Sequence, residues 1–378
     1  MSRDPLLEVE NLRTTFGTER GDVHAVDGIS FTVEEGEVFG IVGESGSGKS
    51  VTALSIMRLV DAPGEVEADA VRYRGEDLLE MSEREMQSVR GGEVAMIFQD
   101  PMSSLNPVMT VGEQIAEVAR HHGDYGESTG FWSEMKRKYV TGTDSDSRSW
   151  QRAVELLDTV GIPDPRQRAH EYPHQLSGGM KQRVMIAQAL AAEPSVIVAD
   201  EPTTALDVTI EAQILDELLN LRDEFGVSVV LITHDLAVVR ETCDRVAVMY
   251  AGELMETAPT GTLFEHPSHP YTNGLLKSIP KVNDDREWLD SIEGNVPNLI
   301  DKQPGCPFRD RCDSAFELCG EPLVNYVGEG ADHGVRCHLY NDAVEVNDDD
   351  EVVAVDERAT EIIEQRETNG RTIGGEIS

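Results

Sequence analysis

The residues best suited to chemistry form a glycine-rich run that ends in a lysine and a hydroxyl. The run matches the phosphate-binding pattern G-x-x-x-x-G-K-[ST] in full and reads Gly43-Glu44-Ser45-Gly46-Ser47-Gly48-Lys49-Ser50. Glycines let the backbone wrap closely around phosphate, so that amide N–H groups face its oxygens. In this pattern the lysine neutralises the β- and γ-phosphates, and the hydroxyl binds Mg²⁺. The run therefore predicts a site for ATP and Mg²⁺ rather than a glycine-rich turn without a ligand.

The segments on either side of the run are those that this chemistry requires. Val38–Val42 is apolar and predicts a strand, and residues 50–60 predict a helix whose first turn holds Ser50 and Val51. A helix N-terminus adds positive potential beside the loop. We therefore include Val51 with the loop in the predicted phosphate site.

Two acids follow a second apolar segment. Asp200 comes directly after residues 195–199, and Glu201 is next. An aspartate at the end of a buried strand can hold Mg²⁺ through water. Glu201 would then lie beside the γ-phosphate and polarise an attacking water, although it could also be a simple exposed acid.

Gln99 and His234 also follow apolar segments, residues 94–98 and 227–233. Helical patterns at 178–192 and 208–225 separate the apolar segments, which predicts parallel strands covered on both faces. Taken alone, a strand-end histidine is more often packed than functional. Gln99 alone could be an ordinary surface residue.

A third motif is Leu176-Ser177-Gly178-Gly179-Met180-Lys181-Gln182. Two glycines before a helix form another anion-binding N-terminus, although such a helix start can also lack a ligand. Within one chain we expect Ser177, Gly178 and Gly179 to lie too far from Lys49 to complete the same site.

Together with Ala205-Leu206-Asp207, these motifs occur in the order found in the ATPase subunits of ABC transporters, which residues 4–263 resemble. The resemblance implies an α/β fold: a P-loop NTPase cassette with a RecA-like core, an antiparallel β subdomain and a helical subdomain. It implies that His234 contacts the γ-phosphate and orients Glu201 or the water. It also implies that Gln99 touches Mg²⁺ and water and responds to the transporter's membrane domains.

In that family, ATP is clamped between two subunits. The resemblance therefore assigns Ser177, Gly178 and Gly179 to the nucleotide of a partner subunit, with Asp207 stabilising the same interface. It also suggests that Phe16 stacks on adenine with Val26 nearby, whereas an aromatic residue between strands is more often part of the core.

The C-terminal part of the chain indicates which group of ABC transporter ATPases the sequence resembles. The segments 266–272 (HPSHPYT), 294–299 (GNVPNL) and 305–312 (GCPFRDRC) resemble the C-terminal extension of dipeptide, oligopeptide and nickel importer ATPases. We therefore expect a small domain at residues 264–340 and a role in peptide import, with nickel or oligosaccharide as alternative cargo. Expected partners are a second ATPase subunit, identical or related, two permease subunits and an extracellular binding protein, at the cytoplasmic face of the membrane.

Four cysteines lie within this extension, at positions 306, 312, 319 and 337, whereas Cys243 stands alone and suits a packed thiol. Disulfides are disfavoured in a cytosolic ATPase, and four thiolates suit zinc or a [4Fe–4S] cluster. The paired CxxC spacing of common zinc sites is missing. The resemblance favours an iron–sulfur cluster held by Cys306, Cys312, Cys319 and Cys337, with zinc or free thiols as alternatives.

The composition indicates the cellular environment of the protein and the partners that it can have. The 378 residues carry 71 acids against 32 bases, a net charge of −39, and only seven of the bases are lysine. This charge argues against general nucleic-acid binding and favours a halophilic, archaeal source with a salt-rich cytoplasm over an ordinary acidic protein. The N-terminus lacks a signal peptide pattern and no apolar run would span a bilayer, so we expect a soluble, cytosolic chain.

Two segments stand apart from the rest by composition. Residues 122–150 are polar and weakly periodic, which predicts a surface insertion. Residues 341–378 predict a largely disordered acidic tail. A soluble ABC ATPase acting on ribosomes or DNA is the main alternative function, but such proteins often carry tandem cassettes or coiled-coil insertions, and this chain has neither.

Overall fold

The computed structural model describes residues 5–99, 104–122, 146–203, 208–278, 292–300, 302, 304–323, 326–327, 332–340, 344–346 and 352–354. The chain forms two compact units. The first comprises residues 1–7, 32–39 and 72–233, and the second comprises residues 8–31, 40–71 and 234–378.

The first unit contains a parallel sheet in the order β9-β8-β7. These strands are β7 (Val94–Ile97), β8 (Val196–Asp200) and β9 (Ser228–Thr233). Ile97 pairs with Ala199, which in turn pairs with Leu231. Every residue of β8 and β9 is buried, as expected for parallel strands covered on both faces. The sequence-based prediction of these strands is confirmed to within one residue at most ends.

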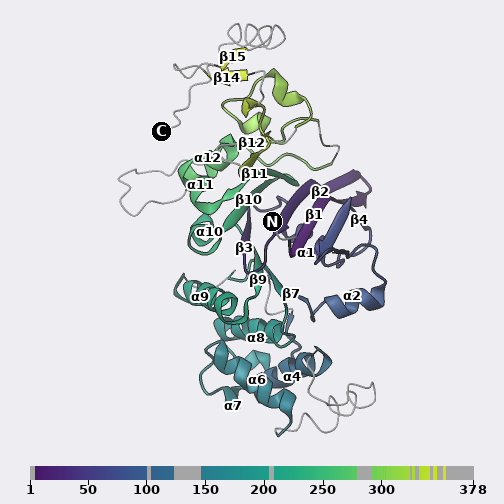
Figure 1. The fold of residues 1–378 in the computed structure, drawn as a ribbon, viewed down its shortest axis with the longest axis vertical. Helices are drawn as coiled ribbons and strands as arrows, with labels where there is room; N and C mark the ends of the chain where they lie inside the picture. Colours follow the sequence, from purple (N-terminus) through teal and green to yellow (C-terminus); the bar gives the residue numbers. More distant parts are fainter. Residues whose placement is uncertain are drawn as a thin grey trace. The chain divides into compact units, whose positions relative to one another are not determined.

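The first unit also contains helices. They are α2 (Glu83–Val89), α4 (Val111–His122), α6 (Arg148–Thr159), α7 (Pro165–Arg168), α8 (Gly178–Leu190) and α9 (Val208–Phe225), with a 3-10 turn at Pro173–Gln175. The helices α4, α6 and α8 pack against one another (Figure 1). They form the predicted helical subdomain, within which the buried Arg120 guanidinium pairs with Glu113 at 3.0 Å.

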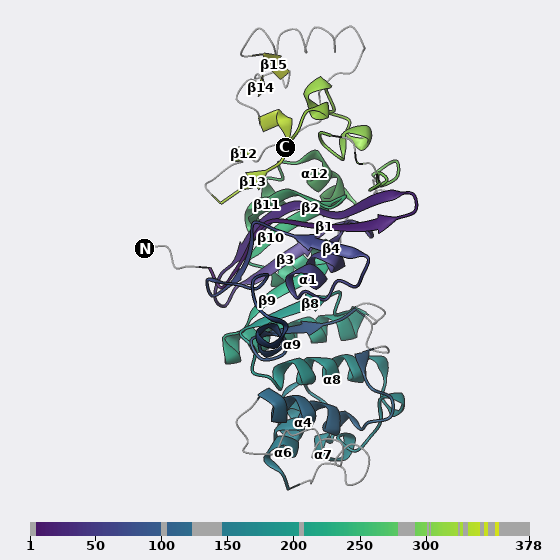
Figure 2. The ribbon, with the colours of Figure 1, turned by 90° about the vertical axis from the view of Figure 1, so that its right-hand side faces the viewer.

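An antiparallel sheet lies mostly in the second unit, in the order β2-β1-β5-β6 with β4 paired to β1. Its strands are β1 (Leu7–Thr18), β2 (Gly21–Val33), β4 (Gly64–Glu67), β5 (Ala70–Tyr73) and β6 (Glu76–Asp77). Figure 2 shows β1 and β2 as two long neighbouring strands. The sequence alone predicts only the short apolar runs Leu7–Val9 and Ile29–Val33 within these two strands, because the remaining parts carry polar residues on the exposed face.

The second unit also holds a sheet in the order β12-β13-β11-β10-β3, where β3 (Val38–Val42) begins in the first unit. The other strands are β10 (Arg245–Tyr250), β11 (Glu253–Pro259), β12 (Tyr326–Val327) and β13 (Gly334–Val335). The helices are α1 (Lys49–Ile56), α10 (Leu236–Thr242), α11 (Thr260–Glu265) and α12 (Pro270–Lys277), with 3-10 turns at Arg309–Arg311, Glu317–Gly320 and His338–Tyr340.

The expected separate domain at residues 264–340 is not seen as a compact unit. Residues 234–378 cluster with the glycine-rich loop instead. The physical reason is that β13 extends the sheet, with Val335 opposite Glu256, and that Lys302 pairs with both Asp27 and Glu253. The extension is therefore built onto the cassette.

The two segments of unusual composition fall mostly outside the described residues. The predicted insertion 122–150 is described only at its ends, where α4 reaches His122 and α6 begins at Arg148. Within the predicted disordered tail, β14 (Val344–Val346) and β15 (Val352–Ala354) pair antiparallel, which their valine content favours. Across the described part of the chain, no helix has the length and hydropathy needed to cross a membrane.

Candidate nucleotide-binding site

The glycine-rich loop is packed so closely that two of its glycines leave no room for a side chain. A Cβ on Gly43 would lie 2.0 Å from the Met249 carbonyl oxygen. A Cβ on Gly48 would lie 2.2 Å from the Ala25 carbonyl oxygen, and Gly48 also has a φ of 105°. Glycine is the residue that tolerates both the approach and this backbone conformation. Strands β2 and β10 therefore set the path of the loop.

Lys49 is held at this loop. Its side chain is buried, and its Nζ donates to the carbonyl oxygens of Gly43 and Glu44 at 2.8 and 2.9 Å. It is also the first residue of α1, so that Ser50 and Val51 follow in the first turn. The N-terminus of α1 thus presents its amide groups at the loop, as the sequence predicted.

Three more predicted residues belong to the second unit. Phe16 is half-buried on β1 opposite Gly64, and Val26 is fully buried on β2. His234 is exposed, directly after β9 and before Asp235, whose carboxylate caps α10. Its exposure contradicts the alternative of a packed strand-end histidine and leaves the ring accessible.

In the first unit, the structure brings Gln99 and Glu201 together. Strands β7 and β8 are parallel neighbours, and these two residues follow their carboxyl ends. The Gln99 amide Nε2 donates to Glu201 Oε2 at 2.8 Å. Asp200, the last residue of β8, directly precedes Glu201 and is 5% exposed.

The backbone of Glu201 is unusual and firmly held. Its φ is 45°, in the left-handed region that non-glycine residues seldom adopt. Its N–H donates to the Ile232 carbonyl at 2.8 Å, which anchors it to the adjacent strand β9. Such strain is concentrated at functional sites, where the surrounding structure enforces it. At this residue the carboxylate is hydrogen-bonded to Gln99.

The third motif lies at the start of α8. Ser177 caps this helix, because its Oγ accepts a hydrogen bond from the Met180 N–H at 3.3 Å. Ser177 and Gly178 are exposed and Gly179 is buried. The helix start is therefore accessible to another molecule. Asp207 lies outside the described residues.

The predicted nucleotide residues are thus divided between the two units. The second holds the loop, Phe16, Val26 and His234, and the first holds Gln99, Ser177, Gly178, Gly179, Asp200 and Glu201.

The four clustered cysteines lie around one small cavity in the second unit. None forms a disulfide, and the Cys306 N–H donates to the Cys319 carbonyl at 2.8 Å. Burial raises the pKa of the Cys306 thiol to about 12, and it also raises that of Cys337. Within the described residues, no three or more His, Cys, Asp or Glu side chains are already arranged to hold a metal ion. Cys243, also buried, packs against Gly40 as expected for a structural thiol.

His269 lines the same cavity and is 1% exposed. Its Nδ1 accepts a hydrogen bond from the Tyr271 N–H at 3.0 Å. Burial lowers the pKa of His269 to about 4, so the neutral ring carries its proton on Nε2. This Nε2–H has no hydrogen-bond acceptor among the described residues, whereas the nearby His338 Nε2 is bonded to the Glu321 carbonyl.

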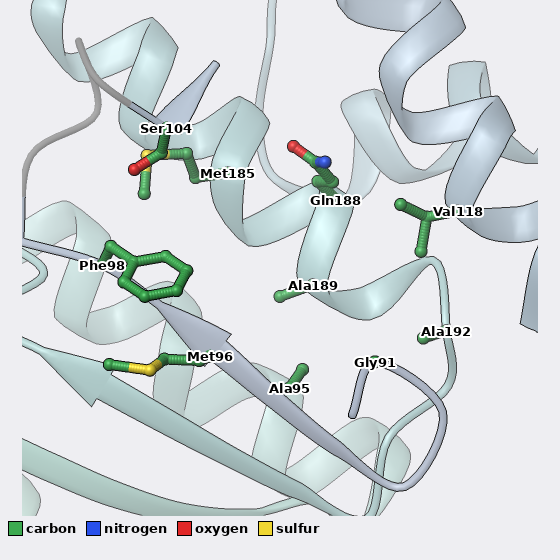
Figure 3. Close-up of a pocket in the computed structure, with 10 residues that line it drawn as sticks. All are labelled: Gly91, Ala95, Met96, Phe98, Ser104, Val118, Met185, Gln188, Ala189 and Ala192. Carbon is green, nitrogen blue, oxygen red and sulfur yellow. The ribbon is translucent and has the colours of Figure 1, made fainter. Parts of the chain in front are cut away.

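An apolar pocket lies between β7, α4 and α8 in the first unit (Figure 3). Phe98 lines this pocket, is 40% exposed and directly precedes Gln99. The sulfur-containing side chains of Met96 and Met185 face the same space. The other residues of the lining are Gly91, Ala95, Ser104, Val118, Gln188, Ala189 and Ala192.

Comparison with known proteins tests the resemblance. Residues 26–204 match the family model "ABC transporter", and residues 255–319 match "Oligopeptide/dipeptide transporter, C-terminal region". The dipeptide transport ATP-binding protein DppD of Escherichia coli (strain K12) is 48% identical over 88% of this chain and 96% of its own length. The chain belongs to the ABC transporter ATP-binding proteins.

Other similar proteins are also ATP-binding proteins or cassettes. A putative peptide import ATP-binding protein of Brucella melitensis is 50% identical over 84% of this chain and 90% of its own length. The oligopeptide transport ATP-binding protein AppD of Bacillus subtilis (strain 168) is 46% identical over 89% of this chain and 97% of its own length. The ATP-binding cassette MJ0796, solved as a dimer bound to ADP and Pi, has a TM-score of 0.54 and 28% identity, covering 67% of this ABC ATPase and 98% of the cassette.

Sequence reasoning missed the residues that hold the loop from the C-terminal side. The Arg311 Nη1 lies 3.1 Å from a carboxylate oxygen of Glu44, and the Tyr271 hydroxyl accepts from the Glu44 N–H at 3.1 Å. Both residues lie within segments that the sequence analysis used, HPSHPYT and GCPFRDRC, but in these segments it assigned a function only to the cysteines. The available signal was the position of Arg311, which directly precedes Cys312.

Proposed function

We propose that this protein is the ATP-hydrolysing subunit that energises import of peptides across the cell membrane. The observation that carries the proposal is that one chain matches both the ABC transporter family and the C-terminal region of oligopeptide/dipeptide transporters. Relatives named for dipeptide, oligopeptide and peptide transport match over most of the chain, which favours peptides over nickel or oligosaccharide.

The loop would bind the triphosphate of ATP. Its amide groups and the N-terminus of α1 would meet the phosphate oxygens, with Lys49 leaving its carbonyl partners to pair with the β- and γ-phosphates. Ser50, Gln99 and Asp200 supply oxygen donors of the kind that Mg²⁺ prefers and would hold this ion. When bound, Mg²⁺ neutralises charge on the phosphates. Phe16 would stack on adenine, with Val26 behind it.

Glu201 would act as the base for the attacking water. The hydrogen bond from Gln99 already fixes one carboxylate oxygen, so the other can accept the proton of the water. His234, exposed at its strand end, would contact the γ-phosphate and orient the water. Asp200 would hold the Mg²⁺ side of the same site.

A second ATPase subunit, identical or related, would complete the pocket. Ser177 and Gly178 are exposed at the start of α8 and would meet the nucleotide of the partner, together with Gly179. Asp207 would stabilise this interface. Binding of ATP would then close the dimer, and loss of the γ-phosphate contacts would let it open.

The apolar pocket beside Gln99 suits a helix of a membrane subunit (Figure 3). Phe98 and the two methionines give it an apolar, adaptable surface. Because Phe98 adjoins Gln99, movement of a docked helix would reach the Glu201 carboxylate through one hydrogen bond. The protein would thus be peripheral at the cytoplasmic face, docked on two permease subunits that receive cargo from an extracellular binding protein.

The test is reconstitution of the protein with its permease subunits in liposomes. Glu201→Gln should lower ATP hydrolysis by a factor of about 10² to 10⁴, the usual contribution of a general base, while ATP still binds. Glu241→Gln, an exposed acid on α10, is the control and should hydrolyse normally. Uptake of nickel or oligosaccharide but not of peptide would contradict the proposed cargo. Hydrolysis of ATP by Glu201→Gln at the native rate would contradict the proposed mechanism.

We also propose that Cys306, Cys312, Cys319 and Cys337 hold a [4Fe–4S] cluster. Two observations support the fit: all four thiols line one cavity, and His269 presents a buried donor there without an acceptor. A cluster sulfur would accept such a hydrogen bond. When bound, the cluster would brace this region or respond to redox state. Anaerobic purification should yield iron and inorganic sulfide in equal amounts, whereas zinc or metal-free protein would contradict the cluster.

Finally, we propose that the protein works in a salt-rich cytoplasm, as expected of a halophilic archaeon. The excess of acids and the scarcity of lysine support this setting.

A further inference from the structure

One residue of the phosphate-binding loop is held by the C-terminal region. Arg311 Nη1 lies 3.1 Å from both carboxylate oxygens of Glu44. The arginine side chain is 7% exposed and that of Glu44 26% exposed, so the pair is largely shielded from water. The two residues are 267 positions apart, and their contact ties the extension directly to the nucleotide loop.

The backbone of Glu44 is held from the same side. The Glu44 N–H donates to the Tyr271 hydroxyl, so this amide is directed to α12. Burial raises the pKa of Tyr271, so the phenol stays neutral, and its oxygen accepts this bond. The Glu44 carbonyl in turn accepts from Lys49 Nζ at 2.9 Å. All three polar groups of Glu44 therefore have defined partners, and one of these partners is the lysine that binds phosphate.

Arg311 is itself fixed by its surroundings. Its Nε donates to the Glu293 carbonyl at 2.9 Å and its Nη2 to the Ile292 carbonyl at 3.1 Å. The Nη1 also donates to the Tyr250 hydroxyl at 3.1 Å, and the guanidinium lies over the Tyr250 and Phe308 rings at 5.6 and 5.8 Å. A guanidinium held by so many groups keeps one position, so it is the C-terminal region that fixes Glu44 rather than the reverse.

The charge of Glu44 makes this contact relevant to ATP. A carboxylate within a phosphate-binding loop repels the triphosphate, and the repulsion is strong where water is partly excluded. Arg311 cancels that charge, while Tyr271 keeps the peptide in place. Loss of Arg311 would leave the Glu44 carboxylate unpaired next to the nucleotide. It would also remove one of the contacts that hold Glu44, whose carbonyl oxygen accepts a hydrogen bond from Lys49.

We propose that Arg311 and Tyr271 are positioning residues for ATP binding, through which the C-terminal region sets the conformation and charge of the nucleotide loop. The pair acts on Glu44, and Glu44 acts on Lys49. The C-terminal region thus has a function within the ATPase site itself, apart from any group that the cysteines hold.

The test measures the ATP affinity and the steady-state KM and kcat of the full-length protein. Arg311→Gln should raise the Kd and KM for ATP about tenfold, the cost of one unpaired partly buried charge, with a smaller change in kcat. Arg311→Lys retains the positive charge but lacks the several N–H donors of the planar guanidinium, so it should bind ATP more tightly than Arg311→Gln and less tightly than the native protein. Tyr271→Phe should raise KM by a smaller factor. Arg240→Gln removes another arginine that lies over an aromatic ring, Phe264, and serves as the control with unchanged KM.

The decisive variant combines Arg311→Gln with Glu44→Gln. If the charge argument is correct, Glu44→Gln alone tightens ATP binding and the double variant binds ATP more tightly than Arg311→Gln. If Glu44→Gln does not improve the affinity of Arg311→Gln, or if Arg311→Gln binds ATP like the native protein, the proposal is wrong. A lower melting temperature with unchanged KM would assign Arg311 a purely structural role and would also overturn it. Failure of the native protein to bind ATP would instead contradict the nucleotide site as a whole.

Discussion

At the scale of residues, the most informative contact is the hydrogen bond between Gln99 and Glu201. It joins Gln99, which directly follows the pocket residue Phe98, to the carboxylate of Glu201, the proposed base. The left-handed backbone of Glu201 shows that the fold accepts strain to hold this carboxylate in place. A mutation at Gln99 should therefore affect the rate of hydrolysis more than the binding of ATP.

Gln99→Ala tests this expectation. The variant removes one donor to the Glu201 carboxylate and one expected Mg²⁺ ligand, so we expect kcat for ATP to fall about tenfold, as for loss of a positioning contact, with KM changed less. Steady-state hydrolysis of ATP measures both constants. Gln188→Ala removes a glutamine side chain on α8 from the pocket that Phe98 lines; it is the matched control and should retain kcat. A rise in KM without a fall in kcat would contradict a positioning role.

At the scale of elements, the strands and helices that position the site followed from the sequence. The strand Val38–Val42 was predicted to the residue, because a fully buried apolar run before a glycine-rich loop has few other interpretations. The association of residues 264–340 with the rest of the second unit was not predicted, because it depends on contacts between distant segments. No local pattern shows that Val335 pairs with Glu256, that Lys302 reaches Asp27 or that Arg311 reaches Glu44. The candidate site was predicted by motif, and its support from the C-terminal region was not.

The pairing of Lys302 with Asp27 can be tested by pH. Burial of Asp27 raises its pKa, but Lys302 and Arg13 outweigh this effect and the net pKa is lowered. A carboxylate with a lowered pKa stabilises the fold above its unfolded pKa of about 4, and this stability is lost as the pH falls through the folded value. Asp27→Asn should therefore lower the free energy of unfolding by about 1 kcal/mol at pH 7. The difference should shrink below about pH 4 in denaturant titrations.

The control for that experiment is Asp69→Asn, an acid with no ion pair among those described. A difference between native protein and Asp27→Asn that stayed constant down to pH 3 would show that the effect comes from packing and not from charge.

At the scale of the whole molecule, the net charge of −39 is the dominant property. Each added acid raises the repulsion within the compact state, and salt screens it, with a Debye length that falls from about 10 Å at 0.1 M to about 3 Å at 1 M. We therefore expect the melting temperature to rise steadily between 0.1 and 2 M KCl, whereas an uncharged osmolyte of equal osmotic strength should have a smaller effect.

The source of this salt dependence can be located by removing the tail. Residues 341–378 hold 12 acids and three arginines, so a chain that ends at Tyr340 still carries a net charge of −30. If repulsion within the folded units governs stability, the shortened chain should keep most of the rise in melting temperature with KCl. Scanning calorimetry of both chains measures this rise. Loss of the salt dependence on removal of the tail would show that the folded units tolerate their own charge and that the proposed high-salt setting lacks a basis in their stability.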